Sequence, residues 1–450
     1  MTRADMLGNP VSGDAAAIAG VDSFILGLLT YRPKMVAVLD QAETHPDHLL
    51  TQVYSGIVWM LLEAPEAPER AAGFIARARA AAKGGTERER MALAALEHWA
   101  AGDIDASIAA LEAAQRAHPR DLVLARLCQY HHFNRGDAPG LLRAGLRAAE
   151  AAPEVAYVHS MAAFGYEQCH LIDKAEAAAH RALAIDRADP WAHHALAHVH
   201  LTRGTVDAGT AFLASVSGMW EGLNSFMYTH NWWHLALFRL SRGEFDAALA
   251  IYDDHVWGRE KSYSQDQVGA ASLLARMEIA GIDVGRRWQD VAAHVALRGA
   301  DTVQPFLTLQ YLYALTRAGR AEADTMMAAV RAESAPLWRA VVTPAAEGLA
   351  AHATGDWETA ATRLGAVLPR LAETGGSHAQ RDLFGQIHLD ALVKSGRIAE
   401  AQQRLELRRC FDPEGVPLNR TLARVYAEAG LPELASEAER RVRARLAGRT

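Results

Sequence analysis

The feature of the sequence that most constrains the fold is the regular return of a glycine. Gly102 and Gly136 lie 34 residues apart, and the same step leads to His170 and then to Gly204. The recurrence continues at spacings of 39, 38, 38, 36, 41 and 34 residues, with Gly243, Gly281, Gly319, Gly355, Gly396 and Gly430. Each position falls where one helical pattern of apolar residues breaks and another begins, so each predicts a turn between two helices.

A helix-turn-helix unit with a period of 34 residues is typical of the tetratricopeptide repeat. One such hairpin cannot bury its apolar face alone, so successive hairpins must stack. The composition agrees, because 50% of the residues are hydrophobic but only 7% are aromatic, and the abundant alanine favours helices over a large sheet. We therefore predict an all-α fold, a superhelical solenoid of degenerate tetratricopeptide (helix-turn-helix) repeats.

The domain organisation follows from where the period is strong and where it fades. We expect a flexible N-terminus over residues 1–20, a divergent N-terminal helical cap over 21–85, a single repeat array over 86–440 and a C-terminal tail over 441–450. Within the cap, the apolar pattern predicts helices at Val21–Leu39, Leu49–Glu63 and Glu69–Ala82.

Charge and hydropathy limit the partners that we expect. The 46 basic and 53 acidic residues give a net charge of -7 without a long run of either sign, so we predict no nucleic-acid partner. No apolar stretch near the N-terminus approaches the ~20 residues of a membrane span, so we expect a cytoplasmic protein with no membrane partner. No motif assigns a cofactor, and we predict none.

Histidines gather in the first helices of two successive repeats. In a tetratricopeptide repeat, the side chains at positions 2, 5, 9, 12 and 13 line the concave groove. With the turn glycine as position 15, His194 and His198 fall at positions 5 and 9. In the next unit His230 and Trp233 fall at positions 2 and 5, and His234 lies at the groove edge. Residues one turn apart share a helix face, so these side chains are predicted to line one stretch of groove.

The neighbouring repeats contribute further groups to this stretch by the same count. They add an aromatic set and one carboxylate, namely Tyr130, Tyr157, Phe164 and Glu167. By contrast, His193 and His200 lie on other sides of their helix and should face elsewhere.

Three interpretations of this patch stay open. The first is that the histidines and aromatic residues only pack helix against helix. The second is a recognition site, because ligands bind concave surfaces with a few convergent polar groups. The third is chemistry, either a metal held by His194, His198 and His230 or acid-base work by a histidine with Glu167. The histidine pair lacks the glutamate of a His-Glu-x-x-His helix, and we assign no metal.

Several blocks of the sequence are distinctive. One runs from His230 to Leu237 and continues from Gly243 to Asp253. The others, in chain order, are Phe164–Glu167, Ala195–Val199, Val284–Gln289 and Gly375–Asp382. Together, from about residue 20 to residue 430, they resemble the tetratricopeptide repeat protein 38 family. The resemblance implies a solenoid of degenerate repeats and carries no assigned reaction.

The resemblance adds one candidate site and shows two departures. Gly375-Gly376 opens a helix with an unusual set of polar residues: Gln380, Arg381, Asp382 and Gln386. The alternative is a plain loop followed by Asp382 as the helix N-cap. Relatives carry an aspartate where this chain has Gly269, and Asn-Asp-Ala-His where it has Leu307–Gln310. If those groups belong to a polar site of the family, this chain has altered it.

We therefore predict a tetratricopeptide-repeat protein whose concave groove or central pocket binds a small molecule or a peptide or protein segment through the His-, Trp- and Tyr-rich patch. The alternative is an enzyme that acts on a small molecule, with the three histidines as acid-base or ligand groups beside Glu167, Arg381 and Asp382. No phosphate loop, nucleophile elbow or dinucleotide fingerprint names a reaction.

Overall fold

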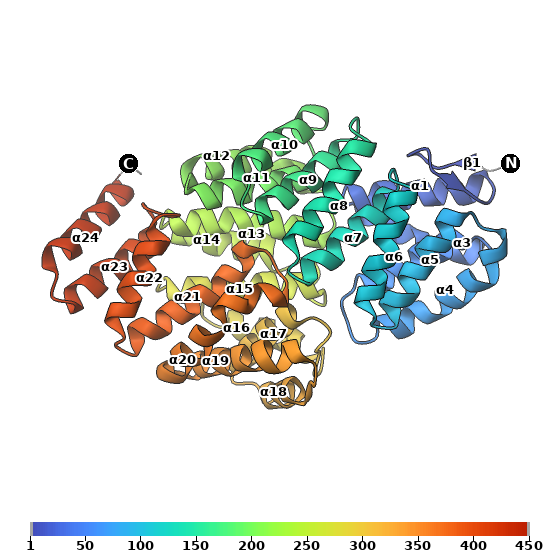
Figure 1. Ribbon diagram of the computed structural model, residues 1–450. Helices are drawn as coiled ribbons and strands as arrows, with labels where there is room; N and C mark the ends of the chain where they lie inside the picture. The colour runs from blue at the N-terminus through green and yellow to red at the C-terminus, as the bar shows by residue number, and fades with distance from the viewer. Residues whose placement is uncertain (1–2, 448–450) are drawn as a thin grey trace. The chain divides into compact units, whose positions relative to one another are not determined.

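The computed structural model describes residues 3–447, and helices make up nearly all of it (Figure 1). Two short strands, β1 (Arg3–Ala4) and β2 (Pro10–Val11), pair antiparallel with Arg3 opposite Val11. The α-helices of the N-terminal part are α1 (Ala15–Leu29), α2 (Val38–Thr44), α3 (Leu49–Met60) and α4 (Ala67–Ala81).

Ten helix pairs follow in chain order within the described residues. They are α5 (Glu87–Ala100) with α6 (Ile104–Ala117), α7 (Leu122–Asn134) with α8 (Ala138–Ala151), α9 (Ala156–Gln168) with α10 (Ile172–Ile185), α11 (Pro190–Arg203) with α12 (Val206–Val216), α13 (Ser225–Ser241) with α14 (Phe245–Ile251), α15 (Ser264–Ile279) with α16 (Arg287–Ala296), α17 (Pro305–Arg317) with α18 (Glu322–Ala332), α19 (Thr343–Thr354) with α20 (Trp357–Val367), α21 (His378–Lys394) with α22 (Ile398–Arg409), and α23 (Val416–Glu428) with α24 (Pro432–Ala447). Short 3-10 or π-helical turns lie at Pro33–Ala37, Ala82–Gly84, Ser217–Trp220, Tyr252–Val256, Trp338–Val342 and Leu368–Thr374.

The predicted all-α repeat fold is confirmed, and the turns between paired helices define its unit. The predicted turn glycines from Gly102 to Gly430 all have positive φ angles, between 66° and 88°. His170, which stands where a glycine is expected, has a φ angle of 57°. This left-handed backbone costs a residue with a Cβ atom about 1–2 kcal/mol, which explains why glycine returns at this place in the repeat.

A pair of alanine substitutions tests this account of the turns. Gly102 has a φ angle of +77° and open space where a Cβ atom would lie, so Gly102→Ala should destabilise the protein through the backbone alone, by about 1 kcal/mol. Gly73 lies inside α4 with equally open surroundings and without a positive φ angle. Gly73→Ala should therefore stabilise the protein, by about 0.5–1 kcal/mol. Urea unfolding followed by circular dichroism measures both effects, and shifts of the same sign would contradict the account.

The chain divides into two compact units, and each is described by itself. Within the described residues, unit 1 comprises 3–195 and 219–227, and unit 2 comprises 196–218 and 228–447. The division passes through α11 and α13. Unit 1 has a continuous apolar core from Leu7 to Met161, and unit 2 contains a core cluster from Ala351 to Ala438.

The N-terminal cap differs from the sequence prediction at its first helix. Instead of one helix over Val21–Leu39, α1 ends at Leu29 and α2 begins only at Val38. Pro33 has no N–H group to continue the helical hydrogen bonds, and Tyr31 has a left-handed φ angle of 54°. These two residues end α1 early and turn the chain into a hairpin.

A buried arginine holds residues 3–20, where the sequence led us to expect a flexible segment. Arg88 of α5 is fully buried and pairs with Asp5 at 2.9 Å and with Asp121 at 2.5 Å. Its guanidinium also donates to the carbonyl oxygen of Pro10 at 3.1 Å. Asp121 in turn caps α7, because its carboxylate accepts a hydrogen bond from the backbone N–H of Leu124 at 3.0 Å. One cation thus joins the strand pair, α5 and the start of α7.

Removal of this cation should cost far more than removal of a surface arginine. Arg88→Met leaves two buried carboxylates unpaired and should destabilise the protein by about 3–5 kcal/mol. Arg135→Met breaks an exposed pair with Asp105 and should cost less than about 1 kcal/mol. The urea midpoints of the two variants give the comparison. Equal losses in the two variants would show that the buried network does not hold the N-terminal segment.

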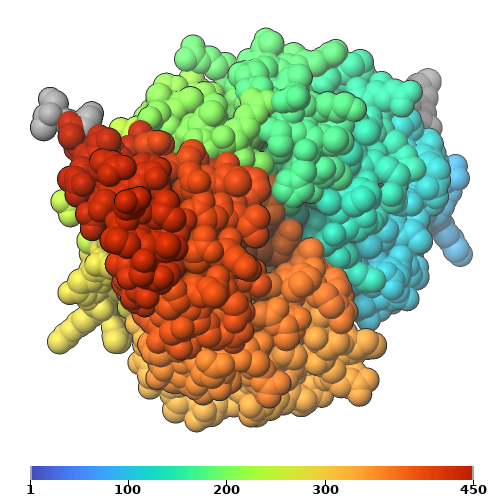
Figure 2. Space-filling model, turned by 60° about the vertical axis from the view of Figure 1, so that its left-hand side comes forward, coloured from blue at the N-terminus to red at the C-terminus, as the bar shows by residue number. Residues whose placement is uncertain are grey.

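The C-terminal hairpins are drawn in red in Figure 2. The helix α24 continues to Ala447, so the described part of the expected tail, residues 441–447, is helical. Several large apolar side chains of these hairpins are exposed, namely Leu407, Phe411, Leu431 and Leu434. None of the helices within residues 3–447 combines the length and the apolar character that a membrane span requires.

Candidate functional site

The helix α11 carries the first pair of predicted site histidines. It begins as the sequence predicts, with the carboxylate of Asp189 accepting hydrogen bonds from the backbone N–H groups of Trp191 at 2.9 Å and Ala192 at 3.1 Å. This cap fixes the start of the helix, and therefore the direction in which each later side chain points. His194 and His198 lie one turn apart on the same face.

The other two histidines of α11 have local structural partners. A ring nitrogen of His193 contacts the carbonyl oxygen of Arg187 at 2.9 Å, and the indole N–H of Trp220 donates to the other at 3.2 Å. His200 pairs with the hydroxyl of Thr205 at 2.8 Å. As the repeat count predicts, these two rings serve helix packing and turn structure on other sides of α11.

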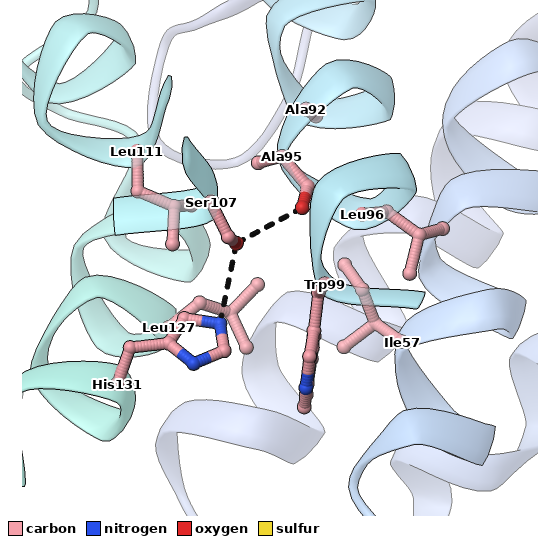
Figure 3. Close-up of a pocket in the computed structure, with 9 residues that line it drawn as sticks. All are labelled: Ile57, Ala92, Ala95, Leu96, Trp99, Ser107, Leu111, Leu127 and His131. Carbon is pink, nitrogen blue, oxygen red and sulfur yellow. Dashed lines mark hydrogen bonds between the residues drawn. The ribbon is translucent and has the colours of Figure 1, made fainter. Parts of the chain in front are cut away.

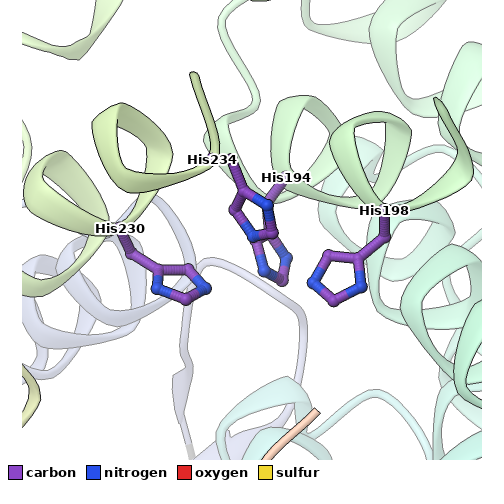
Figure 4. Close-up of side chains that lie close together, drawn as sticks. All are labelled: His194, His198, His230 and His234. Carbon is purple, nitrogen blue, oxygen red and sulfur yellow. The ribbon is translucent and has the colours of Figure 1, made fainter. Parts of the chain in front are cut away.

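Two adjacent helices bring imidazole rings together. The ring centroids of His198 and His234 are 4.7 Å apart, and those of His230 and His234 are 4.9 Å apart. Figure 4 draws these rings. For His198, His230 and His234, which we call the histidine cluster, one ring nitrogen of each lies within 4.8 Å of the others.

The histidine cluster, whose side chains the sequence places in a concave groove or central pocket, is buried. The exposed fraction is 0% for His198, 9% for His230 and 1% for His234. Trp233 covers one side of His230, with the two rings 5.3 Å apart and nearly parallel at 8°. The imidazole rings of the cluster are thus shielded from bulk water.

Two residues that we did not select from the sequence border the cluster in unit 2. His378, the first residue of α21, lies edge-on to His198 with ring centroids 5.4 Å apart. Arg276 of α15 is buried, lies 5.3 Å from the ring centre of Trp233 and donates to the carbonyl oxygen of Ala379 at 2.9 Å. Arg276 therefore ties the start of α21 to α15. The only sign in the sequence that Arg276 has a special place is that it stands as a single arginine within the apolar run of α15.

Burial sets the charge state of two members of the cluster. It lowers the pKa of His230 to about 3, with a further contribution from His198. Burial also lowers the pKa of His234 well below the ordinary value, helped by His198, His230 and Arg276. Both imidazoles are therefore neutral at pH 7.

The low pKa of His230 predicts a loss of stability in acid. In the unfolded chain this histidine takes up a proton near its ordinary pKa of 6.5, whereas in the folded protein it does so only near 3. Stability is therefore lost as the pH falls below about 6.5, by up to about 1.4 kcal/mol per pH unit for this one residue. His230→Gln should flatten the fall of the urea midpoint between pH 7 and pH 5. An identical pH dependence in wild type and variant would contradict a neutral, buried His230.

The predicted residues of unit 1 make the following contacts within that unit. Phe164 packs on His194 with ring centroids 5.2 Å apart. The hydroxyl of Tyr130 donates to Glu63 at 2.9 Å, and that of Tyr157 donates to Asp186 at 3.0 Å. Glu167 of α9 is buried, and its carboxylate accepts a hydrogen bond from the side chain of Gln168 at 2.6 Å.

The polar residues of α21 have structural partners of their own. Ser377, rather than Asp382, is the N-cap of α21, and Gln380 completes a capping box with it. Arg381 donates to the carbonyl oxygen of Gly376. Asp382 pairs with Arg408 at 2.6 Å and accepts from Gln386 at 2.8 Å.

The same contacts account for the charge of Asp382. Burial would raise its pKa, but the Arg408 and Arg276 guanidiniums outweigh burial and hold the pKa well below its ordinary value. Asp382 therefore carries a negative charge, and the neighbouring guanidiniums balance it.

A gap between α5, α6 and α7 of unit 1 lies apart from these groups (Figure 3). Its lining is mainly apolar: Ile57, Ala92, Ala95, Leu96, Trp99, Ser107, Leu111, Leu127 and His131. The Ser107 hydroxyl donates to the carbonyl oxygen of Ala95 at 3.0 Å and contacts a ring nitrogen of His131 at 3.4 Å. Since the gap has no room for a water molecule, it is a packing feature and not a ligand site.

Comparison with known proteins finds helical-repeat structures. No known family model matches the chain. A tetratricopeptide repeat protein from Parabacteroides merdae is 15% identical, covering 67% of this chain and 98% of its own, with a TM-score of 0.33. Human IFIT1 in complex with PPP-AAAA is 13% identical, covering 97% and 96%, with a TM-score of 0.42. Yeast Tom70 is 10% identical, covering 76% and 89%, with a TM-score of 0.30. Likenesses this weak carry no argument about the site.

One sequence prediction needs correction after this comparison. We predicted no nucleic-acid partner from the net charge and from the lack of a long run of either sign. The similar human IFIT1 structures are complexes with PPP-AAAA and m7Gppp-AAAA, and they contradict this exclusion. Net charge is a sum over the whole surface, and it does not determine the potential inside one groove.

Proposed function

We propose that this protein is a binding protein of the tetratricopeptide-repeat type that holds a small ligand at the histidine cluster. The observation that carries the proposal is the convergence of His198, His230 and His234 from two helices into one buried group. Packing alone does not require this, because burying polar imidazoles costs free energy that apolar side chains avoid. Sites where a sequence departs from a simple apolar core are where function is expected.

The burial of the cluster favours a small ligand over a peptide. A peptide in a groove needs a row of exposed side chains, whereas the three rings are between 0% and 9% exposed. The indole of Trp233 lies beside the ring of His230 and provides an apolar wall.

The lowered pKa of His230 and of His234 weighs against acid-base catalysis by these two residues. A general base works best with a pKa near the working pH, and the pKa of His230 is about 3. At pH 7 both rings are neutral, which suits binding better than proton transfer.

Family membership is part of the same proposal. The sequence blocks around His230, Gly243 and Gly375 support a diverged bacterial member of the tetratricopeptide repeat protein 38 family. With it we carry forward the sequence-based proposals of a cytoplasmic location and a single repeat array over 86–440.

A thermal-shift screen tests the proposal. Tag-free protein is heated with a panel of small polar metabolites and, separately, with Zn²⁺, because a ligand that binds the folded state raises the melting temperature. We expect at least one compound or ion to stabilise wild type and to lose that effect in His234→Asn.

The matched control is His200→Asn, which changes a histidine of α11 outside the cluster. It should respond as wild type does. If nothing in the panel stabilises wild type more than His234→Asn, the cluster is not a ligand site and the proposal is wrong.

A further inference from the structure

We infer that the ligand of the histidine cluster is a late first-row transition-metal ion, held by the imidazole nitrogens of His198, His230 and His234; this inference rests on the proposed function. All three residues belong to unit 2, and α11 and α13 supply them. Neutral imidazole is a preferred ligand of zinc, copper, nickel and iron.

The spacing of the ring nitrogens supports a metal. In a tetrahedral centre with bonds of 2.0–2.1 Å, ligand nitrogens lie about 3.3 Å apart. The nitrogens of the cluster lie within 4.8 Å of one another, so side-chain rotations that close about 1.5 Å at most bring them to bonding distance. Three histidines with one open position are the ligand set of a binding or catalytic metal rather than of a closed structural one.

The donor type predicts selectivity. Mg²⁺ and Ca²⁺ prefer oxygen ligands, whereas the three groups of the cluster offer nitrogen. We therefore expect Zn²⁺ and Co²⁺ to bind and Mg²⁺ to bind poorly.

Residues around the cluster position its rings. His378 lies edge-on to His198 and contacts the hydroxyl of Thr202 through a ring nitrogen at 3.2 Å. Arg276 holds the start of α21, where His378 lies, through the carbonyl oxygen of Ala379. Such supporting contacts set the orientation of metal ligands and hence their affinity.

Cobalt titration tests the inference directly. Tag-free, metal-free protein at pH 7 is titrated with Co²⁺, whose visible absorption reports a four-coordinate nitrogen site, and Zn²⁺ is then added in competition. We expect one Co²⁺ per chain, displaced by one Zn²⁺ and not by excess Mg²⁺. The variants His198→Asn, His230→Asn and His234→Asn should each lose affinity by at least about 100-fold, and His200→Asn should bind as wild type does.

Several outcomes would overturn the inference. They are the absence of a visible Co²⁺ spectrum in wild type, a spectrum of six-coordinate character, or equal binding by His234→Asn and His200→Asn. Circular dichroism of each variant establishes that it is folded. Where a cluster variant does not fold, the spectrum and stoichiometry of wild type alone decide.

The result separates this inference from the proposed function. If metals fail to bind but a metabolite stabilises wild type and not His234→Asn, the metal inference is wrong and the ligand-binding function stands. If neither metal binding nor stabilisation by a metabolite depends on the cluster, the metal inference and the proposed function are both wrong.

Discussion

A helical hairpin of this chain can bury its apolar face only against the hairpin that follows, and everything else in the structure depends on this. The turn that closes each hairpin requires a left-handed residue, which is why positive φ angles recur from Gly102 to Gly430. Once the turn is set, the two helices of a pair lie antiparallel and present apolar side chains to the next pair. The histidines of α11 and α13 belong to this stacked arrangement and not to a loop grafted onto it.

This origin explains the chemistry of the candidate site. Side chains on stacked helices become buried, and burial lowers the pKa of His230 and His234. A rigid group of neutral imidazoles is poorly suited to moving protons at pH 7 and well suited to coordinating an ion. Arg276 contributes both to this environment, by disfavouring protonation of His234, and to its rigidity, by holding the first turn of α21.

The sequence predicted the parts that depend on local pattern. The turn positions, the Asp189 cap of α11 and the division of its histidines between two sides all follow from spacing and side-chain type. The break at Pro33 is also visible in the sequence, but the prediction of one helix over Val21–Leu39 followed the apolar pattern and ignored the proline.

Long-range packing decided what the sequence could not predict. No local pattern states that His378 lies beside His198, because the two are far apart in the chain and meet only after folding brings α21 beside α11. The polar residues of α21 looked like a site because four of them are close in sequence. Their partners, a capping serine, a loop carbonyl and Arg408, emerge only in the folded chain.

The central claim is that stacked helices gather imidazole nitrogens into a group that holds a transition metal. X-ray absorption at the zinc edge, on protein loaded with one equivalent of Zn²⁺, tests it most directly. The account predicts at least three nitrogen scatterers at about 2.0–2.1 Å together with the outer-shell pattern of imidazole rings. A six-coordinate shell of oxygen scatterers without that pattern would contradict it.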